Sequence, residues 1–163
     1  PVRRTPRRPG DPVAAGLVFS PLLWAALGPT STAPDQPDTL SCLTPRALSG
    51  LAALPPGLVL TSVDPGSFLL AHTPHQALAG AYHRNVEGNV AALDALLASA
   101  PEGVAAARRR GVAYVATCDA LADMAGFAAT RPGSLAAALA AGRPPQELEP
   151  IALDGPWRVY RLR

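Results

Sequence analysis

The feature that most constrains this chain is the alternation of short, β-branched apolar runs with Ala- and Leu-rich segments of helical pattern. Leu58–Val63 (LVLTSV) and Val112–Cys118 (VAYVATC) have the pattern of buried strands, and Gln76–Tyr82 is expected to form another strand between them. Strands that alternate with helices generally build a parallel sheet. The sequence therefore predicts an α/β fold, with a mostly parallel sheet of about four to five strands and flanking helices.

Helix signals fill the segments between these strands. Asp64-Pro65 offers an N-cap and a first-turn proline for a short helix that continues through Leu70. Pro101 is expected to break the next helical stretch and restart it. A further helical region is predicted over residues 120–141. The helix before Pro101 carries an apolar stripe made of Val90, Leu93, Leu96 and Leu97.

The C-terminal residues have the pattern of a β-hairpin. Ile151–Leu153 and Trp157–Leu162 are expected to be strands, and the Asp154-Gly155 turn joins them. We expect this hairpin to add an antiparallel edge to the otherwise parallel sheet.

The N-terminal part of the chain has the layout of a membrane segment. Residues 1–11 are rich in arginine, Val13–Leu27 carry no charge, and residues 28–39 are polar and rich in proline. The apolar run has about 15 residues, fewer than the ~20 that cross a bilayer, and Pro21 interrupts it. A last transmembrane helix, a signal-peptide core and a buried helix of the soluble domain are therefore all open interpretations.

The first two interpretations leave everything after the apolar segment outside the cytoplasm. We accordingly expect residues 1–41 to comprise the basic flank, the apolar segment and a linker, and residues 42–163 to form a soluble α/β domain. Because the chain opens with Pro1, we expect it to be a fragment or a processed product. All fourteen basic residues are arginine, which is typical of proteins from GC-rich bacterial genomes.

Two cysteines, Cys42 and Cys118, occur without the CxxC spacing of metal or redox sites. Outside the cytoplasm they are expected to form a disulfide that joins the start of the domain to the end of the third strand. Two free buried thiols are the alternative.

Several phrases of the domain resemble a known family. They are Leu54-Pro55-Pro56-Gly57, Asp64-Pro65-Gly66, the run His72–Asn85 (HTPHQALAGAYHRN), the GVAYVATC strand and the terminal WRVYRLR strand. Together, over about residues 42–163, they resemble the soluble C-terminal domain of bacterial polytopic membrane proteins related to GT-C glycosyltransferases. Tyr82-His83-Arg84-Asn85 is the most distinctive of these phrases.

The resemblance implies an extracytoplasmic accessory or substrate-contacting domain of a multi-spanning membrane protein. Such proteins are thought to use polyprenyl-linked sugars, and the catalytic acid of GT-C enzymes usually lies in a loop near the first transmembrane helices, outside this sequence. The implied partners are the upstream transmembrane region of the same protein and a polyprenyl-linked sugar or other anionic ligand. The implied location is the bacterial inner membrane, with residues 42–163 in the periplasm and with neither a catalytic centre nor a cofactor of their own.

His83-Arg84-Asn85 is the leading candidate ligand site, because a strand is expected to end and a helix to begin there. In parallel α/β sheets, ligand sites gather at this carboxyl edge. Arg84 has the chemistry to clamp a phosphate or carboxylate, and the first amides of the helix favour an anion. The negative charge of Glu87 opposes such binding.

Asp64 and Asp119 also follow predicted strands and are expected near the same edge. Paired carboxylates can perform acid–base chemistry, and together with His83 they would suit a small secreted hydrolase. More simply, each aspartate and Asn85 caps the helix that follows it, and Arg84 pairs with one of the aspartates. An accessory domain is therefore the first functional hypothesis, an anion or sugar-phosphate binding module the second, and a hydrolase the third.

Other classes of site receive less support. His72, His75 and His83 could ligate zinc together with Asp64, but a straight strand would separate the last two histidines by about 25 Å, so no metal site is expected. The sequence has no nucleophile elbow, P-loop or dinucleotide fingerprint. Apart from its leading arginines the chain is acidic, which argues against nucleic-acid binding.

Overall fold

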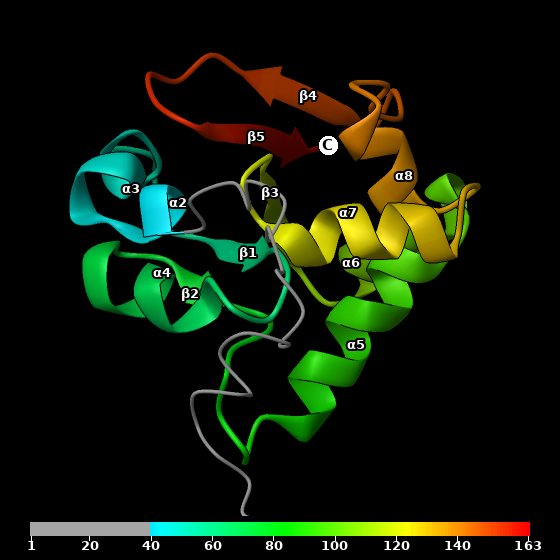
Figure 1. The fold of residues 1–163 in the computed structure, drawn as a ribbon, viewed down its shortest axis with the longest axis horizontal. Helices are drawn as coiled ribbons and strands as arrows, with labels where there is room; N and C mark the ends of the chain where they lie inside the picture. The colour runs from blue at the N-terminus through cyan, green and yellow to red at the C-terminus, as the bar shows by residue number, and fades with distance from the viewer. Residues whose placement is uncertain (1–39) are drawn as a thin grey trace, which may run out of the picture. The chain divides into compact units, whose positions relative to one another are not determined.

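The computed structural model describes residues 40–163 (Figure 1). Helices and strands alternate in the order expected for an α/β domain. The described helices are α2 (Leu40–Leu43), α3 (Pro45–Ala52), α4 (Gly66–His72), α5 (Val86–Leu97), α6 (Ala100–Arg109), α7 (Ala122–Thr130) and α8 (Leu135–Ala140). The described strands are β1 (Leu58–Leu60), β2 (Gln76–Ala77), β3 (Val112–Cys118), β4 (Leu148–Ile151) and β5 (Trp157–Leu162).

These five strands form one sheet with the order β2-β1-β3-β5-β4. β1 pairs in parallel with both β2 and β3, so the predicted parallel core is present. β5 lies between β3 and β4 and is antiparallel to both, which confirms the C-terminal hairpin. The predicted fold class is therefore confirmed.

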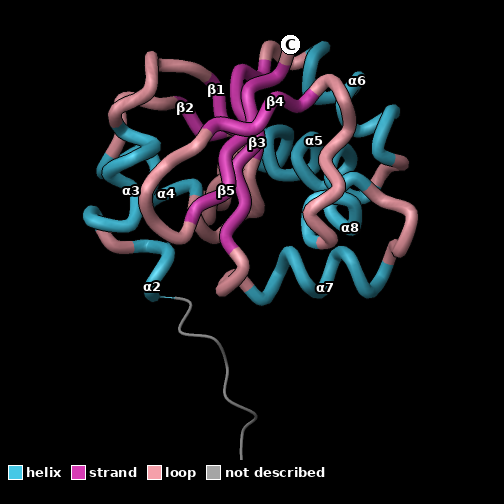
Figure 2. The backbone as a smooth tube through the Cα atoms, turned by 90° about the horizontal axis from the view of Figure 1, so that it is seen from above, coloured by secondary structure: helices cyan, strands magenta, loops and turns pink. Residues whose placement is uncertain are grey.

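Helices cover both faces of the sheet (Figure 2). α2, α3 and α4 pack on one face, where Leu48 is part of the core, and α5 to α8 pack on the other, where Leu96 is part of the core. β3 serves both cores, since Val115 belongs to one and its neighbours Tyr114 and Ala116 belong to the other. This burial on both faces explains why β3 is a continuous apolar run in the sequence.

The predicted disulfide between Cys42 and Cys118 is present, with Cα atoms 6.4 Å apart. Both residues are fully buried. The indole Nε1 of Trp157 donates a hydrogen bond of 3.0 Å to the carbonyl oxygen of Cys42. The disulfide and this bond tie α2 to two neighbouring strands, β3 and β5.

Two strands are shorter than predicted. β1 contains three residues, and β2 contains Gln76–Ala77 instead of continuing to Tyr82. The start of α4 contacts the segment after β2 so closely that a Cβ on Gly66 would lie 1.9 Å from the carbonyl oxygen of Ala79. The chain after β2 therefore packs against this helix, and Leu78 and Ala79 are buried without being part of a strand.

The helices differ from the predictions in two places. The region predicted over residues 120–141 is two helices, α7 and α8, with Pro132-Gly133 between them, since a proline cannot continue a helix. Val90 does not face the core as predicted, because 49% of it is exposed. The break near Pro101 is confirmed, because α6 begins there with the proline in its first turn.

The C-terminal hairpin has a longer connection than predicted. β4 begins at Leu148 and ends at Ile151, so residues 152–156 join it to β5 in place of a two-residue turn. Gly155 is at a φ of +115°, a conformation that favours glycine.

The apolar segment Val13–Leu27 lies outside the described residues, so its expected role stays a prediction. The same holds for the expected division of the chain into residues 1–41 and 42–163. Between residues 40 and 163, none of the helices combines the length and the hydropathy needed to cross a bilayer.

Candidate functional site

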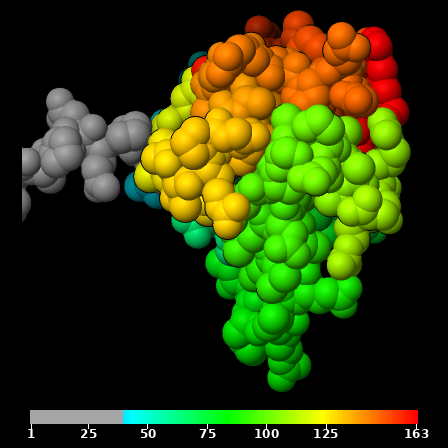
Figure 3. Space-filling view, turned by 90° about the vertical axis from the view of Figure 1, so that its right-hand side faces the viewer, coloured from blue at the N-terminus to red at the C-terminus, as the bar shows by residue number. Residues whose placement is uncertain are grey.

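The loop between β2 and α5, together with the first turns of α5, projects from the rest of the described residues (Figures 1 and 3). We refer to residues 82–90 as the tip. His83 and Arg84 lie in the tip and are exposed. Within residues 40–163, the Arg84 side chain forms neither a hydrogen bond nor an ion pair. Its guanidinium donors are therefore free to bind a ligand.

Asn85 occupies the N-cap position of α5, as predicted, but its side chain does not cap the helix. The Nδ2 group donates instead to the carbonyl oxygen of Leu78 at 3.1 Å and to Oδ1 of Asn89 at 3.3 Å. The same Oδ1 accepts a hydrogen bond of 2.9 Å from the backbone N–H of Gly80. Asn85 thus joins the start of α5 to the residues that follow β2 and positions the tip.

The start of α5 is closely packed, and the charge of its acidic residue is paired. A Cβ on Gly88 would lie 2.2 Å from the carbonyl oxygen of Leu78 and 2.4 Å from Oδ1 of Asn85. Glu87 forms an exposed ion pair of 2.8 Å with Arg110. These contacts leave Arg84 as the main donor for an anion, and anion binding at the tip stays a prediction.

Asp64 and Asp119 follow β1 and β3, at the same edge of the parallel part of the sheet. Asp119 forms an ion pair with Arg158 of β5, which lies antiparallel beside β3. Asp64 is exposed, and within the described part of the chain it has no hydrogen-bond partner. Neither aspartate caps the helix after it, because α4 and α7 have no side-chain cap. No contact between described residues joins these carboxylates to each other or to Arg84.

Two buried hydroxyl groups precede Asp64. Thr61 and Ser62 are each 1% exposed, and their hydroxyl oxygens have no hydrogen-bond partner among residues 40–163. They follow β1, where its neighbours β2 and β3 lie on opposite sides and the order of the parallel strands reverses. Ligands of open α/β sheets bind outside this point, but both hydroxyls are enclosed by protein, so a ligand there would not contact them directly.

A cavity of about 270 Å³ lies at the carboxyl end of β3. Asp119 and Arg158 are its charged residues, and Leu121 and Met124 contribute apolar surface. Because the carboxylate and the guanidinium are bonded to each other, they offer few free groups for acid–base chemistry.

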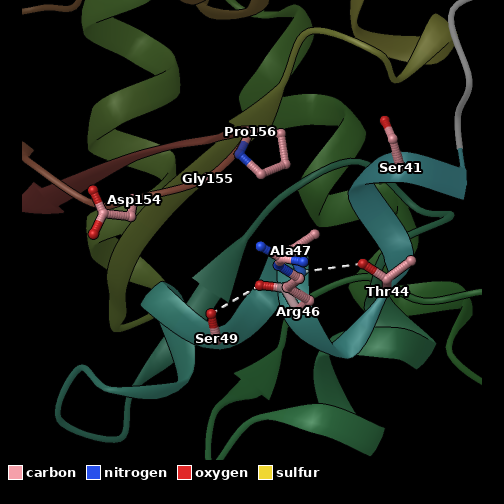
Figure 4. A pocket seen from close by; sticks show the side chains of 8 residues that line it. All are labelled: Ser41, Thr44, Arg46, Ala47, Ser49, Asp154, Gly155 and Pro156. Atoms are coloured by element: carbon pink, nitrogen blue, oxygen red, sulfur yellow. Dashed lines mark hydrogen bonds between the residues drawn. The ribbon is translucent and has the colours of Figure 1, made fainter.

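A larger cavity, of about 370 Å³, is bordered by the start of α3 and by the connection before β5 (Figure 4). Two of its hydroxyls stabilise the helix: Thr44 Oγ1 accepts from the N–H of Ala47 at 3.1 Å, and Ser49 Oγ donates to the carbonyl oxygen of Arg46 at 2.8 Å. Arg46 and Asp154 are the charged residues that border it. This cavity is polar, but the arrangement has no nucleophile activated by a base.

His75 is buried and has a structural environment. Its Nδ1 accepts a hydrogen bond of 3.1 Å from the N–H of Gly57, and its Nε2 lies 2.8 Å from the carbonyl oxygen of Leu51. The edge of its ring faces Tyr114, with ring centroids 5.4 Å apart. Among the described residues, no three His, Cys, Asp or Glu side chains are grouped as metal ligands would be.

The sequence pattern did not predict the exposed apolar surface of the tip. Tyr82, Val86 and Val90 are exposed there, although Val90 was expected to be in the core. The available signal was the row of small residues Gly88, Ala92 and Ala95, which lets α5 approach its neighbours closely on the opposite side; Ala92 and Ala95 are buried.

The sequence matches no protein-family model and no curated protein. By structure, the chain is similar to the C-terminal globular domain of an oligosaccharyltransferase from Archaeoglobus fulgidus, with a TM-score of 0.52 and 13% sequence identity. The match covers 72% of this chain and 92% of that domain. The described chain therefore has the fold of an oligosaccharyltransferase C-terminal globular domain, in agreement with the resemblance to C-terminal domains of glycosyltransferase-like proteins.

Proposed function

We propose that residues 42–163 form an extracytoplasmic accessory domain of a multi-spanning, glycosyltransferase-like membrane protein of the bacterial inner membrane. The domain lies in the periplasm, contacts the upstream transmembrane region of the same protein and contributes no catalytic centre. The observation that carries this proposal is the fold shared with the C-terminal globular domain of an oligosaccharyltransferase.

Two further observations support the proposal. The disulfide between Cys42 and Cys118 suits an oxidising compartment outside the cytoplasm. The candidate acidic residues Asp64 and Asp119 have separate surroundings, and Asp119 is engaged by Arg158. A domain of this kind supports a reaction whose acid–base groups lie elsewhere in the parent protein.

The test uses the complete gene product in its own membranes. Transfer of sugar from a polyprenyl-linked donor is measured with the intact protein and with a variant that lacks residues 42–163. We expect the deletion to lower transfer while the upstream region still inserts into the membrane, and the purified domain alone to transfer no sugar. Transfer by the isolated domain, or recovery of the complete protein in the soluble fraction, would contradict the proposal.

A second candidate function is binding of a sugar phosphate or another anion at the tip. The observation that favours it is the exposed Arg84 guanidinium, which has no partner among residues 40–163. Arginine recognises phosphate through paired charge-assisted hydrogen bonds.

Titration with inorganic pyrophosphate tests this second candidate. We expect Arg84→Ala to weaken pyrophosphate binding at least tenfold, which is roughly the loss of one charge-assisted contact, and to leave the melting temperature unchanged. Arg131→Ala, at an exposed arginine after α7, is the matched control and should change neither quantity. Equal binding by the wild-type and Arg84→Ala proteins would exclude the tip as an anion site.

A further inference from the structure

Three exposed apolar side chains gather at the tip. Tyr82 is 44% exposed, Val86 is 64% exposed and Val90 is 49% exposed. Val86 and Val90 are four residues apart in α5, so they share one face of the helix, and Tyr82 precedes them in the loop. The surfaces of soluble proteins carry scattered single apolar residues, whereas a group of apolar side chains on a projecting segment indicates a contact surface.

Hydrogen bonds and close packing join the tip to the residues that follow β2. Its base is fastened by the bonds of Asn85 and Asn89 to Leu78 and Gly80. The ring of Tyr82 lies against Gly80, where a Cβ would be 2.9 Å from the ring. The apolar surface therefore exists before any partner binds.

Arg84 gives the tip one cation without an acidic partner among residues 40–163, and Asp94 places a carboxylate one helical turn beyond Val90 on the same face of α5. Glu87 is the single acidic residue between Tyr82 and Val90, and Arg110 pairs with it. His83 and Arg84 are exposed. A surface that is complementary to this tip is apolar opposite Val86 and Val90 and anionic opposite Arg84.

We propose that the tip inserts into the headgroup region of an anionic lipid bilayer. Val86 and Val90 enter the boundary between headgroups and acyl chains, the Tyr82 ring lies at the interface, and Arg84 binds lipid phosphate. Aromatic rings with one polar end favour this depth, and arginine pairs with phosphate through several donors.

The small size of the apolar surface favours a bilayer over a protein partner. A stable protein interface uses about 20–30 residues from each side, and only three large apolar side chains are exposed here. Interfacial lipid binding needs only a few inserted side chains together with electrostatic attraction. The inference rests on the proposed function only because that function places a bilayer close to the domain.

The experiment measures tip insertion with tryptophan and brominated lipids. Val86→Trp places a fluorophore in the tip, and Ala129→Trp places one at an exposed position of α7 as the matched control. Each full chain is mixed with vesicles of phosphatidylglycerol and phosphatidylethanolamine that contain brominated lipid. The native tryptophans and the apolar segment are common to all variants, so differences report on the introduced residue.

We expect quenching of the tryptophan at position 86 and none at position 129. Arg84→Gln should weaken binding to anionic vesicles about fivefold, the effect of one basic residue near such a surface, whereas Arg131→Gln should not. Replacing Val86 and Val90 by serine should weaken binding about tenfold or more, because two buried apolar side chains are lost. Vesicles of phosphatidylcholine should bind less strongly than anionic vesicles.

Three outcomes would overturn the inference. Absence of quenching at position 86 with anionic vesicles excludes insertion. Concentration-dependent self-association that requires Val86 and Val90 assigns the surface to a second copy of the chain. If the tryptophan at position 86 is shielded from water in monomeric protein without lipid, the tip contacts another part of the same chain. The vesicle experiment contains no sugar donor, so an absence of insertion would leave the proposed accessory function intact. A negative result in the sugar-transfer test would likewise leave the quenching result unchanged.

Discussion

The imidazole of His75 links two turns of the chain through its two nitrogens. Because the backbone N–H of Gly57 donates to Nδ1, the proton of the neutral ring lies on Nε2, which donates to the carbonyl oxygen of Leu51. Tyr114 completes the arrangement, since its hydroxyl donates to the carbonyl oxygen of Pro55 at 3.1 Å. These side chains hold the Pro55-Pro56-Gly57 turn against the start of β1.

His75→Phe is therefore expected to destabilise the domain by about 1–3 kcal/mol, because the N–H of Gly57 loses its acceptor and the carbonyl oxygen of Leu51 keeps only its bond from the N–H of Leu54. Urea unfolding of the wild-type and variant proteins measures this difference. His72→Phe is the control, since His72 is exposed at the end of α4, and it should change stability by less than about 0.5 kcal/mol. Similar stability for the two variants would show that the buried bonds of His75 contribute little.

At the scale of the elements, the close packing of α4 against the segment after β2 requires a glycine. A Cβ on Gly66 would meet the backbone of Ala79 at 1.9 Å, and backbone atoms cannot move aside as a flexible side chain can. This contact fixes where β2 ends and where the loop toward the tip begins.

Gly66→Ala should consequently destabilise the domain by about 2 kcal/mol or more through overpacking. Gly126→Ala is the matched control: it lies within α7, a Cβ there meets no atom within 4 Å, and alanine should stabilise the helix by about 0.5–1 kcal/mol. Thermal unfolding followed by circular dichroism compares the two variants. If both changed the melting temperature in the same direction, close packing at Gly66 would not be the cause.

The strand β5 carries a pH-dependent contribution to stability. Burial raises the pKa of Tyr160 above its usual value, so the folded protein favours the neutral phenol. As the pH rises above about 10, the unfolded chain loses this proton first, and stability falls until the pH passes the folded pKa. The contribution is thus fully present at lower pH and lost in alkali.

Tyr160→Phe is expected to flatten this alkaline loss. The free energy of unfolding, measured with urea between about pH 8 and pH 11, should fall less steeply for the variant than for the wild-type protein. Other groups that titrate in this range are common to both proteins, so the difference reports on Tyr160. Parallel pH profiles for the two proteins would contradict a raised pKa at this residue.

For the whole molecule, the disulfide joins the first described helix to the central strand, across a sequence separation of 76 residues. Closing a loop of this length restricts the unfolded chain, and such bonds typically stabilise proteins by about 2–4 kcal/mol. Cys42→Ser combined with Cys118→Ser should therefore lower the guanidinium midpoint, and reducing agent should affect only the wild-type protein. An unchanged midpoint in the double variant would show that the bond is dispensable for stability.

Local sequence signals predicted those parts of this protein that depend on neighbouring residues. Val112–Cys118 was predicted with its correct bounds, because a β-branched run after Gly111 has few alternatives to a buried strand. The break near Pro101 follows from the chemistry of one residue. The cysteine pairing was expected from compartment and count, while the alternative of two free thiols needed the structure to exclude it.

The tertiary structure decided what depends on residues distant in the sequence. It placed β5 between β3 and β4, limited β2 to two residues, and turned Val90 outward while α5 packed through its small residues. It also paired Asp119 with Arg158 and left Arg84 without a partner among residues 40–163. Periodicity shows that an apolar face exists, but burial and ion pairing depend on which elements meet, and that is fixed by packing across the whole domain.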